Sequence, residues 1–290
     1  MSSVDSLATE IRHHLGPPPT LERWPLVSIV VLNHDGAAHL RRLMAGLVER
    51  TDYPAGRMEL ILVDNGSGDD SLELMREVEA PFPISILANP HNESFSDANN
   101  QGAELAGGEL LLFLNNDIEP FEPGWLCELV ACLRTSGAGS VGATLVYPDR
   151  ERGSGKFRVQ TRPFRLRGGQ DRVTIVPATE RQELLDEDFG QDLESVSVIG
   201  AALLIDRGLF WAIGGFTHGY FYGGEDEDLS MKLRERGSSV LYSGRSVLLH
   251  HVSSTSHKLH GGAKGALRNA NSRLLRQRWG ARAWREYQLG

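Results

Sequence analysis

Short apolar runs alternate with helical patterns from Val27 onward, and this alternation restricts the chain to few folds. The apolar runs are VSIVVL, LILVDNGS, ISILANP, LLLFL and VGATLVY. HLRRLMAGLVER and SLELMREVEA, which lie between the first three runs, have helical spacing. Strands that are apolar throughout and alternate with helices favour a parallel sheet that is buried on both faces. The sequence therefore predicts an α/β fold, with helices on both faces of one central sheet.

The sequence divides into a peripheral start, a main domain and a basic end. In residues 1–25, apolar residues with helical spacing precede three consecutive prolines, so we expect a short N-terminal helix and a Pro-rich linker. Residues 26–256 hold the alternating pattern and form the main domain. Within it, residues 149–195 are polar with weak periodicity, which predicts a variable insertion or a mobile loop region. Residues 257–290 are expected to form a basic C-terminal helical segment.

Regular patterns return after the polar region, at VSVIGAALLID. We expect helices near RGLFWAIGG and in EDEDLSMKLRERG, because apolar residues recur there at helical spacing. SSVLYS and RSVLLHH are expected to be two further strands. These elements complete the main domain.

Composition and charge exclude several classes of protein. The 290 residues, of which 40% are hydrophobic and 23% charged, are typical of a soluble globular protein. A formal charge of -8 argues against a nucleic-acid partner, because phosphate binding needs concentrated Lys and Arg. No run approaches the roughly 18 apolar residues of a membrane span, and the N-terminus lacks the hydrophobic centre of a signal peptide, so we expect a cytoplasmic location. Cys127 and Cys132 fit neither a zinc site nor a disulfide framework, and we expect reduced packing residues.

Polar clusters follow three of the expected strands. In open α/β sheets, ligands collect at the carboxyl ends of the strands. One such cluster is more often a turn or a helix cap, but three at one edge favour a binding site. No glycine-rich phosphate loop follows VSIVVL, so the phosphates of a ligand must be held otherwise, and Asp117 is the obvious candidate to hold Mg²⁺ or Mn²⁺. The clusters are residues 33–35, residues 64 and 65, and residues 115–117.

Four segments in a fixed order resemble the family 2 glycosyltransferases, in particular the bacterial rhamnosyltransferase-like branch. They are VSIVVLNHDG, LILVDNGSGD, NPHNESFSDANNQGAELAGGELLLFLNND and GYFYGGEDEDLSMKLRERG. The resemblance covers about residues 27–256. It implies a GT-A fold, with a mixed, mostly parallel central sheet flanked by helices. It also implies an inverting reaction and a nucleotide-diphosphate sugar donor of the UDP or dTDP type.

The resemblance assigns donor-side roles to single residues. Residues 115–117 match the DXD motif, in which Asp117 is the metal-binding carboxylate, and Asp64 matches the position that recognises the pyrimidine base. The chain departs from the family pattern at two positions. Ser94 replaces the usual Gly of the NxGFAxxNN segment, and Asn115 replaces the first Asp of DXD, which leaves one carboxylate fewer for the metal. The donor-binding candidates, with the strand-end residues included, are Asn33, Asp35, Asp64, Asn65, Asn92, Phe95, Asn99 and Asn116.

An acidic run at residues 225–228 stands at the start of an expected helix, where by itself it is typical of a solvated N-terminus. It follows GYFYGG, whose glycines can bring the backbone beside a ligand. By resemblance, Asp226 matches the last Asp of the ED motif, whose role is the catalytic base. Asp228 cannot share the direction of Asp226 on a helix, so we expect a structural role for it. The acceptor-side candidates are Tyr222, Gly223, Gly224 and Glu225.

His250 and His251 end the last expected strand. A histidine at a strand end more often packs than binds a ligand, although imidazole also suits transition metals. Because neighbouring residues of a strand face opposite ways, we expect only one of the two to point into the site. The register of the metal-binding His in the resembled family selects His250. The predicted metal ligands are therefore Asp117 and His250, and the predicted ion is Mg²⁺ or Mn²⁺.

Together these features predict an inverting, metal-dependent glycosyltransferase. It would move rhamnose or a related hexose to a saccharide or lipid-linked acceptor in polysaccharide or glycoconjugate biosynthesis. Two alternatives stay open. A nucleotidyltransferase shares the sheet and the acidic metal site, and a non-catalytic protein that binds a nucleotide sugar can keep the fold without turnover. Two roles also stay open for the basic C-terminal segment. It either packs on the catalytic domain or contacts anionic lipid at the inner face of the membrane.

Overall fold

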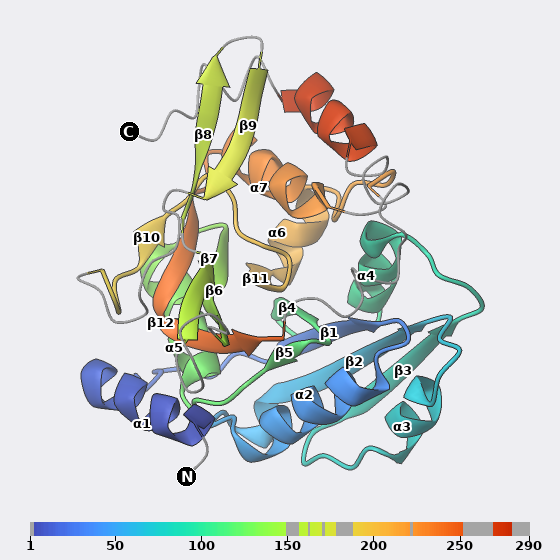
Figure 1. Cartoon of the computed structure of the whole chain (residues 1–290), viewed down its shortest axis with the longest axis vertical. Helices are drawn as coiled ribbons and strands as arrows, with labels where there is room; N and C mark the ends of the chain where they lie inside the picture. Colours follow the sequence, from blue (N-terminus) through green and yellow to red (C-terminus); the bar gives the residue numbers. More distant parts are fainter. Residues whose placement is uncertain are drawn as a thin grey trace.

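The computed structural model describes residues 3–148, 157–161, 163–169, 172–177, 188–220, 223–251 and 269–279. A ten-stranded sheet has the main strand order β10-β12-β6-β11-β4-β1-β2-β3, with β5 paired to β12 and β7 paired to β6 (Figure 1). Helices flank this sheet, so the predicted mixed α/β architecture is confirmed.

The elements have the following bounds. The first part contains α1 (Ser3–Leu15), β1 (Val27–Asn33), α2 (Ala37–Glu49), η1 (Ala55–Arg57), β2 (Met58–Asn65), α3 (Ser71–Glu77), β3 (Ile84–Asn89), α4 (Phe95–Glu104), β4 (Leu110–Asn115), β5 (Ile118–Glu119) and α5 (Trp125–Ser136). The second part contains β6 (Ser140–Pro148), β7 (Phe157–Thr161), β8 (Phe164–Gly169), β9 (Arg172–Pro177), β10 (Leu193–Glu194), β11 (Ala202–Asp206), α6 (Arg207–Ala212), α7 (Glu225–Glu235) and β12 (Val240–His250). A further helix covers residues 269–279.

Strand β1 lies at the centre of the parallel part of the sheet, between β2 and β4. Ile29 and Val31 pack in the same buried cluster as Leu43 of α2. Val30, which faces the other way, packs with Ala98 of α4. Both faces of the strand are therefore covered, which is why its sequence is continuously apolar instead of alternating.

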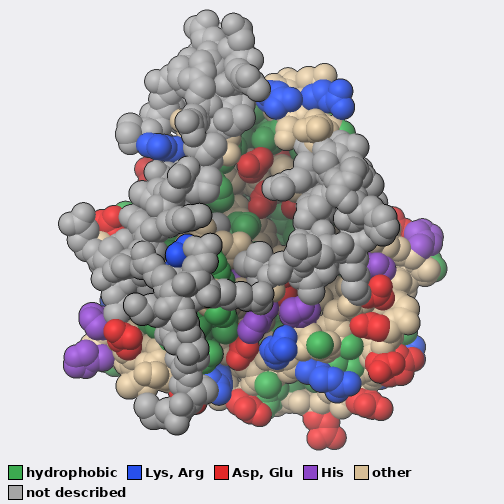
Figure 2. Space-filling view, in the orientation of Figure 1, with side chains coloured by type: hydrophobic (Ala, Val, Ile, Leu, Met, Phe, Trp, Pro, Cys, Tyr) green, Lys and Arg blue, Asp and Glu red, His purple; other side chains and the backbone are tan. Residues whose placement is uncertain are grey.

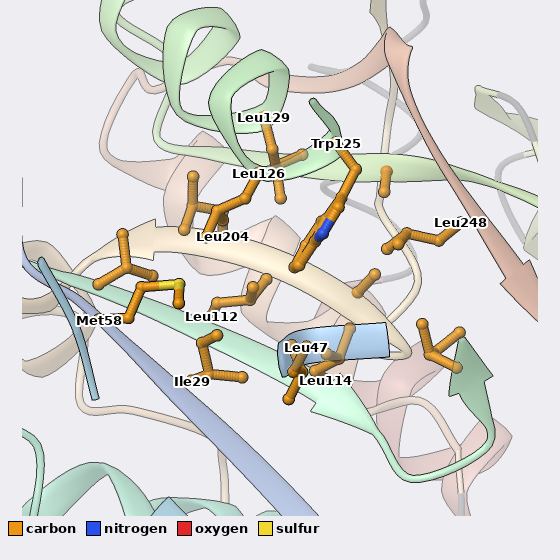
Figure 3. Packing of buried hydrophobic residues seen from close by; sticks show 14 of the residues in the cluster. Ile29, Leu47, Met58, Leu112, Leu114, Trp125, Leu126, Leu129, Leu204 and Leu248 are labelled. Atoms are coloured by element: carbon orange, nitrogen blue, oxygen red, sulfur yellow. The ribbon is translucent and has the colours of Figure 1, made fainter. Parts of the chain in front are cut away.

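Helix α5 covers one face of the strands that lead to the site (Figure 3). Leu126 and Leu129 of this helix pack in one cluster with Leu112 of β4 and Leu204 of β11. Trp125, at the start of the helix, is fully buried. Burial of such side chains contributes roughly 1.5–3 kcal/mol each, so this layer holds β4 and β11 rigidly in place.

Helix α1, expected from residues 1–25, packs its apolar side against the main domain. Ile11 is fully buried in a cluster that includes Val247 and Leu249 of β12. Arg12 lies 2.7 Å from Glu122 and 3.2 Å from Glu128, two carboxylates that are almost completely buried. The helix therefore neutralises buried charge as well as covering apolar surface.

The polar region of residues 149–195 contains strands among its described residues. β7 pairs with β6 in the main sheet, and β8 and β9 form a separate two-stranded sheet. β10 pairs with β12 at the edge of the main sheet. These strands carry charged side chains such as Arg158 and Arg165, which explains why no apolar periodicity marks them.

Strand β12 corrects one expectation, because SSVLYS and RSVLLHH form a single strand instead of two. Its pairing with β6 shifts register between Ser243 and Val247. Gly244 lies in this irregular stretch, where an added Cβ would come within 2.2 Å of the carbonyl oxygen of Gln191. The strand therefore bulges where another backbone approaches closely.

The two cysteines are buried free thiols, as expected. Burial raises the pKa of the Cys127 thiol to about 12, so this thiol stays protonated, and it donates to the carbonyl of Asp52 at 2.8 Å. Among the helices that the structure describes, none is long and apolar enough to cross a bilayer.

Candidate functional site

The three polar clusters at strand ends lie next to one another. Asn33 at the end of β1 pairs in register with Asp64 of β2. On the other side of β1, Leu32 pairs with Asn115 of β4. Because β1 lies between two parallel partners, all three clusters meet at one edge of the sheet, as the sequence predicts.

A chain of hydrogen bonds links these clusters. Asn116 donates from Nδ2 to Oδ1 of Asn33 at 2.7 Å. Asn33 in turn donates to Oγ of Ser67 at 3.4 Å, and the backbone N–H of Ser67 donates to Oδ2 of Asp64 at 3.2 Å. Gly36 permits the first contact, because a Cβ there would come within 2.2 Å of Asn116 Nδ2. Asn33 and Asn116 therefore fix the spacing between the Asp64 and Asp117 sides of the site.

Asp64 has one carboxylate oxygen with no partner among the described residues. The side chain is only 3% exposed, and its Oδ1 atom is buried without a hydrogen bond. A buried polar atom without a partner costs about 1–3 kcal/mol. An N–H group of a ligand would remove this cost, which fits the predicted contact with a pyrimidine base.

Asp35 and Asn65 shape the loops around Asp64. Asp35 adopts a left-handed backbone conformation, with φ of 49°, and accepts from the backbone N–H of Gly68 at 2.7 Å. Asn65 donates to Oδ1 of Asn92 at 2.8 Å and accepts from the backbone N–H of Glu93 at 3.1 Å. These predicted donor-side residues lie together, and they hydrogen-bond both to loop backbone and to one another.

The start of α4 brings a second segment to the site. Ser94, which stands where the resembled family has Gly, caps this helix by accepting from the backbone N–H of Asp97 at 3.1 Å. The departure from the family pattern therefore has a structural use. Asn99 donates to the carbonyl of Phe95 at 2.9 Å within the same helix. The Phe95 ring lies beside Gly200, where an added Cβ would be 3.5 Å from the ring.

The predicted metal ligands Asp117 and His250 are in contact. Oδ1 of Asp117 lies 3.1 Å from Nε2 of His250, and the two side chains are 13% and 8% exposed. The neighbouring His251 instead contacts Glu119 at 2.6 Å. Strand β5 explains this geometry, because its Ile118 pairs with His250 and so sets Asp117 beside the end of β12. Of the two histidines, His250 is the one that faces the DXD-like carboxylate.

The chemistry of this pair fits a divalent cation. Nδ1 of His250 lies 2.6 Å from Oε1 of Gln160, so its two ring nitrogens both face oxygen acceptors. A neutral imidazole can donate its one N–H to Gln160 and turn its other nitrogen to an ion shared with Asp117. Two neighbouring ligands of one octahedral ion lie about 3 Å apart, close to the observed separation. The described residues include no group of three or more His, Cys, Asp or Glu that could hold a metal ion, so ligand oxygens or water would complete the coordination.

Sequence reasoning missed two residues on this side. Gln160 of β7 lies in the polar region without clear periodicity, so no local signal marks it. His39 of α2 has its ring 6.3 Å from that of His251, and burial lowers the pKa of His39. His39 lies in the first turn of α2, shortly after the predicted cluster of residues 33–35, and this position is the signal that would have pointed to it.

The predicted base, Asp226, lies in the first turn of α7. Its Oδ2 atom accepts from the backbone N–H of Gly200 at 2.9 Å, and Oδ1 accepts from that of Glu227 at 2.8 Å. An added Cβ at Gly200 would be 3.5 Å from both Asp226 and Phe95, so the base lies next to the donor-side segment. Burial raises the pKa of Asp226, although the backbone donors oppose this effect.

The acceptor-side candidates lie immediately before Asp226, and Tyr222 falls outside the described residues. Gly223 and Gly224 have φ angles of 81° and 95°, which only glycine adopts readily. Glu225 is 6% exposed, and its Oε2 atom has no partner among the described residues. Burial and the adjacent Asp226 raise the pKa of Glu225 well above its usual range.

Figure 2 shows acidic and histidine side chains near the middle of the face seen in this orientation. Asp64 can accept a hydrogen bond from a nucleobase, and Asp117 and His250 can hold a cation. Asp226 can accept a proton from a substrate. The family model described as "Glycosyl transferase family 2" matches residues 28–211, which is more than half of the chain. The chain belongs to glycosyl transferase family 2. The match includes the three strand-end clusters and ends before Asp226 and His250.

The relatives include an O-antigen biosynthesis protein and a rhamnosyltransferase. The chain is 31% identical over 241 residues to the O-antigen biosynthesis protein RfbC of Myxococcus xanthus, covering 80% of this chain and 18% of that protein. It is 27% identical over 248 residues to N-acetylglucosaminyl-diphospho-decaprenol L-rhamnosyltransferase of Mycobacterium tuberculosis, covering 78% and 76%. The protein y4gI of Sinorhizobium fredii is 31% identical over 83% of this chain, which spans 27% of that relative.

Solved glycosyltransferases share the fold. GalNAc-T7 with UDP, GalNAc and Mn²⁺ matches with a TM-score of 0.62 and 22% identity, over 79% of this chain and 44% of that one. The mannosyltransferase PcManGT of Pyrobaculum calidifontis, in complex with GDP-Man and Mn²⁺, matches with a TM-score of 0.59 and 15% identity, over 88% and 66%. The GT-A fold that the family resemblance implies is therefore confirmed.

Proposed function

We propose that this family 2 chain is an inverting, metal-dependent glycosyltransferase. It moves rhamnose or a related hexose from a nucleotide-diphosphate donor to an acceptor hydroxyl in polysaccharide or glycoconjugate biosynthesis. The observation that carries the proposal is the continuous polar edge that runs from Asp64 through Asn33 and Asn116 to Asp117. At one end of this edge, Oδ1 of Asp64 is buried with no partner among the described residues, and at the other end lies the carboxylate–imidazole pair.

The donor fits this edge by its chemistry. The nucleobase of the donor would place an N–H group against Oδ1 of Asp64. The pyrimidine of a UDP or dTDP donor has such a group at its edge. Asp117 and His250 would hold Mg²⁺ or Mn²⁺, which supplies positive charge to the diphosphate as it leaves. The Mn²⁺ that accompanies UDP in GalNAc-T7 and GDP-Man in PcManGT supports a divalent cation and a nucleotide donor.

Asp226 supplies the remaining step. With the diphosphate as the leaving group, one base suffices: Asp226 takes the proton of the acceptor hydroxyl while that oxygen attacks C1 of the sugar from the opposite face. One displacement inverts the anomeric centre. The raised pKa of Asp226 makes it a stronger base than an exposed Asp, because burial disfavours its charged form.

Binding and turnover are tested in one series. A thermal shift panel of UDP, dTDP and GDP sugars with Mn²⁺ or Mg²⁺ identifies the donor, since a ligand that binds only the folded state raises the melting temperature. Release of nucleoside diphosphate from that donor then reports turnover. Pyrophosphate release from a nucleoside triphosphate and a sugar phosphate would instead show a nucleotidyltransferase. Binding without either release would show a non-catalytic protein.

Asp64→Asn is expected to weaken the binding of uridine and thymidine by about ten- to hundred-fold, because a hydrogen bond to a charged group is worth about 1.5–3 kcal/mol. The loss should occur without metal, since the contact is to the base. NMR titration with each nucleoside measures it. Asp70→Asn is the matched control, because this Asp lies exposed near the same loop. Weaker binding of the diphosphates alone, with nucleoside binding unchanged, would contradict the assignment.

The C-terminal helix carries the proposed contact with anionic lipid, which suits a lipid-linked acceptor of the kind named for the mycobacterial relative. Arg273 and Arg276 are exposed one turn apart on this helix. Each Arg near an anionic membrane contributes about 1 kcal/mol, so Arg273→Gln/Arg276→Gln should bind phosphatidylserine vesicles roughly thirty-fold more weakly. Liposome flotation measures this. Arg57→Gln/Arg76→Gln, two exposed arginines elsewhere, is the control. Equal flotation of both variants, or wild-type binding that salt does not reduce, would refute the contact.

A further inference from the structure

Asp228 is the most heavily bonded carboxylate around α7 among the described residues. It is fully buried, two positions after the proposed base. Its Oδ2 atom accepts from Thr217 at 2.6 Å, and Nζ of Lys232 lies 3.8 Å from it. Its Oδ1 atom accepts from Tyr220 at 3.2 Å. These partners tie α7 to the segment that precedes it.

The other partners of Asp228 come from the C-terminal helix, far along the chain. Nε of Arg278 and Nε1 of Trp279 both donate to Oδ1 of Asp228 at 2.7 Å. Trp279 is 7% exposed and packs with Val196 and Met231. In Figure 1 the helix is the red element beside α7. The basic segment is therefore docked on the catalytic domain through a buried charge as well as through apolar packing.

The same helix also reaches the acceptor-side glycines. Nδ2 of Asn271 donates to the carbonyl of Gly223 at 2.8 Å. An added Cβ at Gly224 would be 3.8 Å from the Cβ of Asn271 and 3.1 Å from the Tyr220 ring. Gly224 precedes Glu225 and Asp226 directly. The helix of residues 269–279 therefore contacts the chain on both sides of Asp226. Before Asp226 it bonds to the backbone of Gly223, and after Asp226 it bonds to the side chain of Asp228.

We propose that Asp228 is a positioning residue, through which the helix of residues 269–279 holds Asp226 and the acceptor-side backbone in their working geometry. The proposal rests on the function proposed above and adds a part of the acceptor side that lies outside the range of the family match. The helix contacts the chain on either side of Glu225 and Asp226. Asp64 and Asp117, in contrast, lie at or just after the ends of other elements, strands β2 and β4. Loss of the docking contacts should therefore affect turnover and spare donor binding.

Trp279→Phe tests this inference, because it keeps an aromatic ring in the packing and removes the N–H donated to Asp228, together with part of the buried indole. Asn271→Leu is the second variant, since it removes the bond to Gly223 at similar volume. The assay is the Mn²⁺-dependent release of nucleoside diphosphate from the donor found in the panel, with water as the acceptor. We expect kcat to fall by roughly ten- to hundred-fold, because small misplacements of a reacting group cost this much. The donor KM and the calorimetric affinity for the nucleoside diphosphate should stay within about two-fold of wild type.

Arg12→Gln is the matched control for a general loss of stability. It also disturbs a buried carboxylate network that docks a terminal helix, and that helix, α1, lies at the opposite end of the molecule in Figure 1. This variant should melt at a lower temperature and keep the wild-type kcat at a temperature where it is folded. Hydrogen exchange of the Gly200 amide, which donates to Asp226, should quicken in Trp279→Phe and not in Arg12→Gln.

The outcomes separate the two proposals. A wild-type protein that neither binds nor hydrolyses any donor overturns the proposed function. Wild-type turnover that survives in both Trp279→Phe and Asn271→Leu overturns only the positioning role of Asp228. A fall in kcat that simply follows the melting temperature in all three variants, with Arg12→Gln included, overturns that role as well.

Discussion

Asp226→Asn is expected to lower the rate of sugar transfer by about a hundred- to ten-thousand-fold, because general-base catalysis is typically worth that much. The affinity for the donor should stay at the wild-type level, since Asp226 contacts neither Asp64 nor Asp117. Both oxygens of Asp226 accept from backbone N–H groups, and an amide can keep only one of these bonds. The variant should therefore also lose about 1 kcal/mol of unfolding free energy. Single-turnover kinetics and calorimetry with the nucleoside diphosphate measure the two effects separately.

The pH dependence of the rate supplies a second check on Asp226. The base must be ionised, so the rate should fall as pH decreases through the pKa of Asp226. Burial raises this pKa, which places the acid limb above the range of an ordinary Asp, whose pKa is about 3.9. Glu225→Gln should leave the acid limb of the pH–rate profile nearly unchanged. The raised pKa of Glu225 favours its protonated carboxyl, and the amide of Gln resembles that form.

Two variants in the same helical turn serve as controls. Glu227→Gln removes one negative charge beside Asp226 and should transfer sugar at nearly the wild-type rate. Asp228→Asn should lower the melting temperature strongly, because four side chains donate to this buried carboxylate. Near wild-type transfer by Asp226→Asn would remove it as the base. An inactive but fully stable Asp228→Asn, with Asp226→Asn still active, would show that the ED motif is misaligned by two positions.

The strand-end half of the site could be predicted from the sequence because it depends on local pattern and sheet order. Asn33, Asp64 and Asn115 each follow an apolar run, and parallel strands place such ends at one edge. The choice of His250 followed from the resemblance, and its contact with Asp117 agrees with that choice.

The rest depends on contacts between distant segments that leave no local pattern. Gln160 reaches His250 from a polar strand 90 residues earlier in the chain. Trp279 reaches Asp228 across 51 residues, and Asn271 reaches Gly223 across 48. Helical spacing in the basic segment shows that one side is apolar, but the buried carboxylate that this side meets lies elsewhere in the sequence.

Asp117→Ala is expected to abolish the metal-dependent part of donor binding. The proposed ion is held by Asp117 and His250, and it would bridge the protein to the diphosphate. With one of two protein ligands removed, the affinity for the nucleoside diphosphate in Mn²⁺ should fall to the level of wild type in EDTA. The affinity for the nucleoside itself should not change, because Asp64 lies two strands away in the β2-β1-β4 order. Calorimetry with and without Mn²⁺ measures the affinity for the nucleoside diphosphate and the affinity for the nucleoside.

Glu119→Ala is the matched control for this variant. Glu119 lies on the adjoining short strand and contacts His251, so its removal takes away the same charge without touching the proposed ligand pair. Metal-dependent binding should persist in it. Asp117→Ala must also fold normally, which is expected because the structure shows one side-chain hydrogen bond of its carboxylate among the described residues, that with His250. Unchanged diphosphate affinity with Mn²⁺ in Asp117→Ala, or loss of that affinity in Glu119→Ala alone, would place the ion at the second carboxylate–imidazole pair instead of the first.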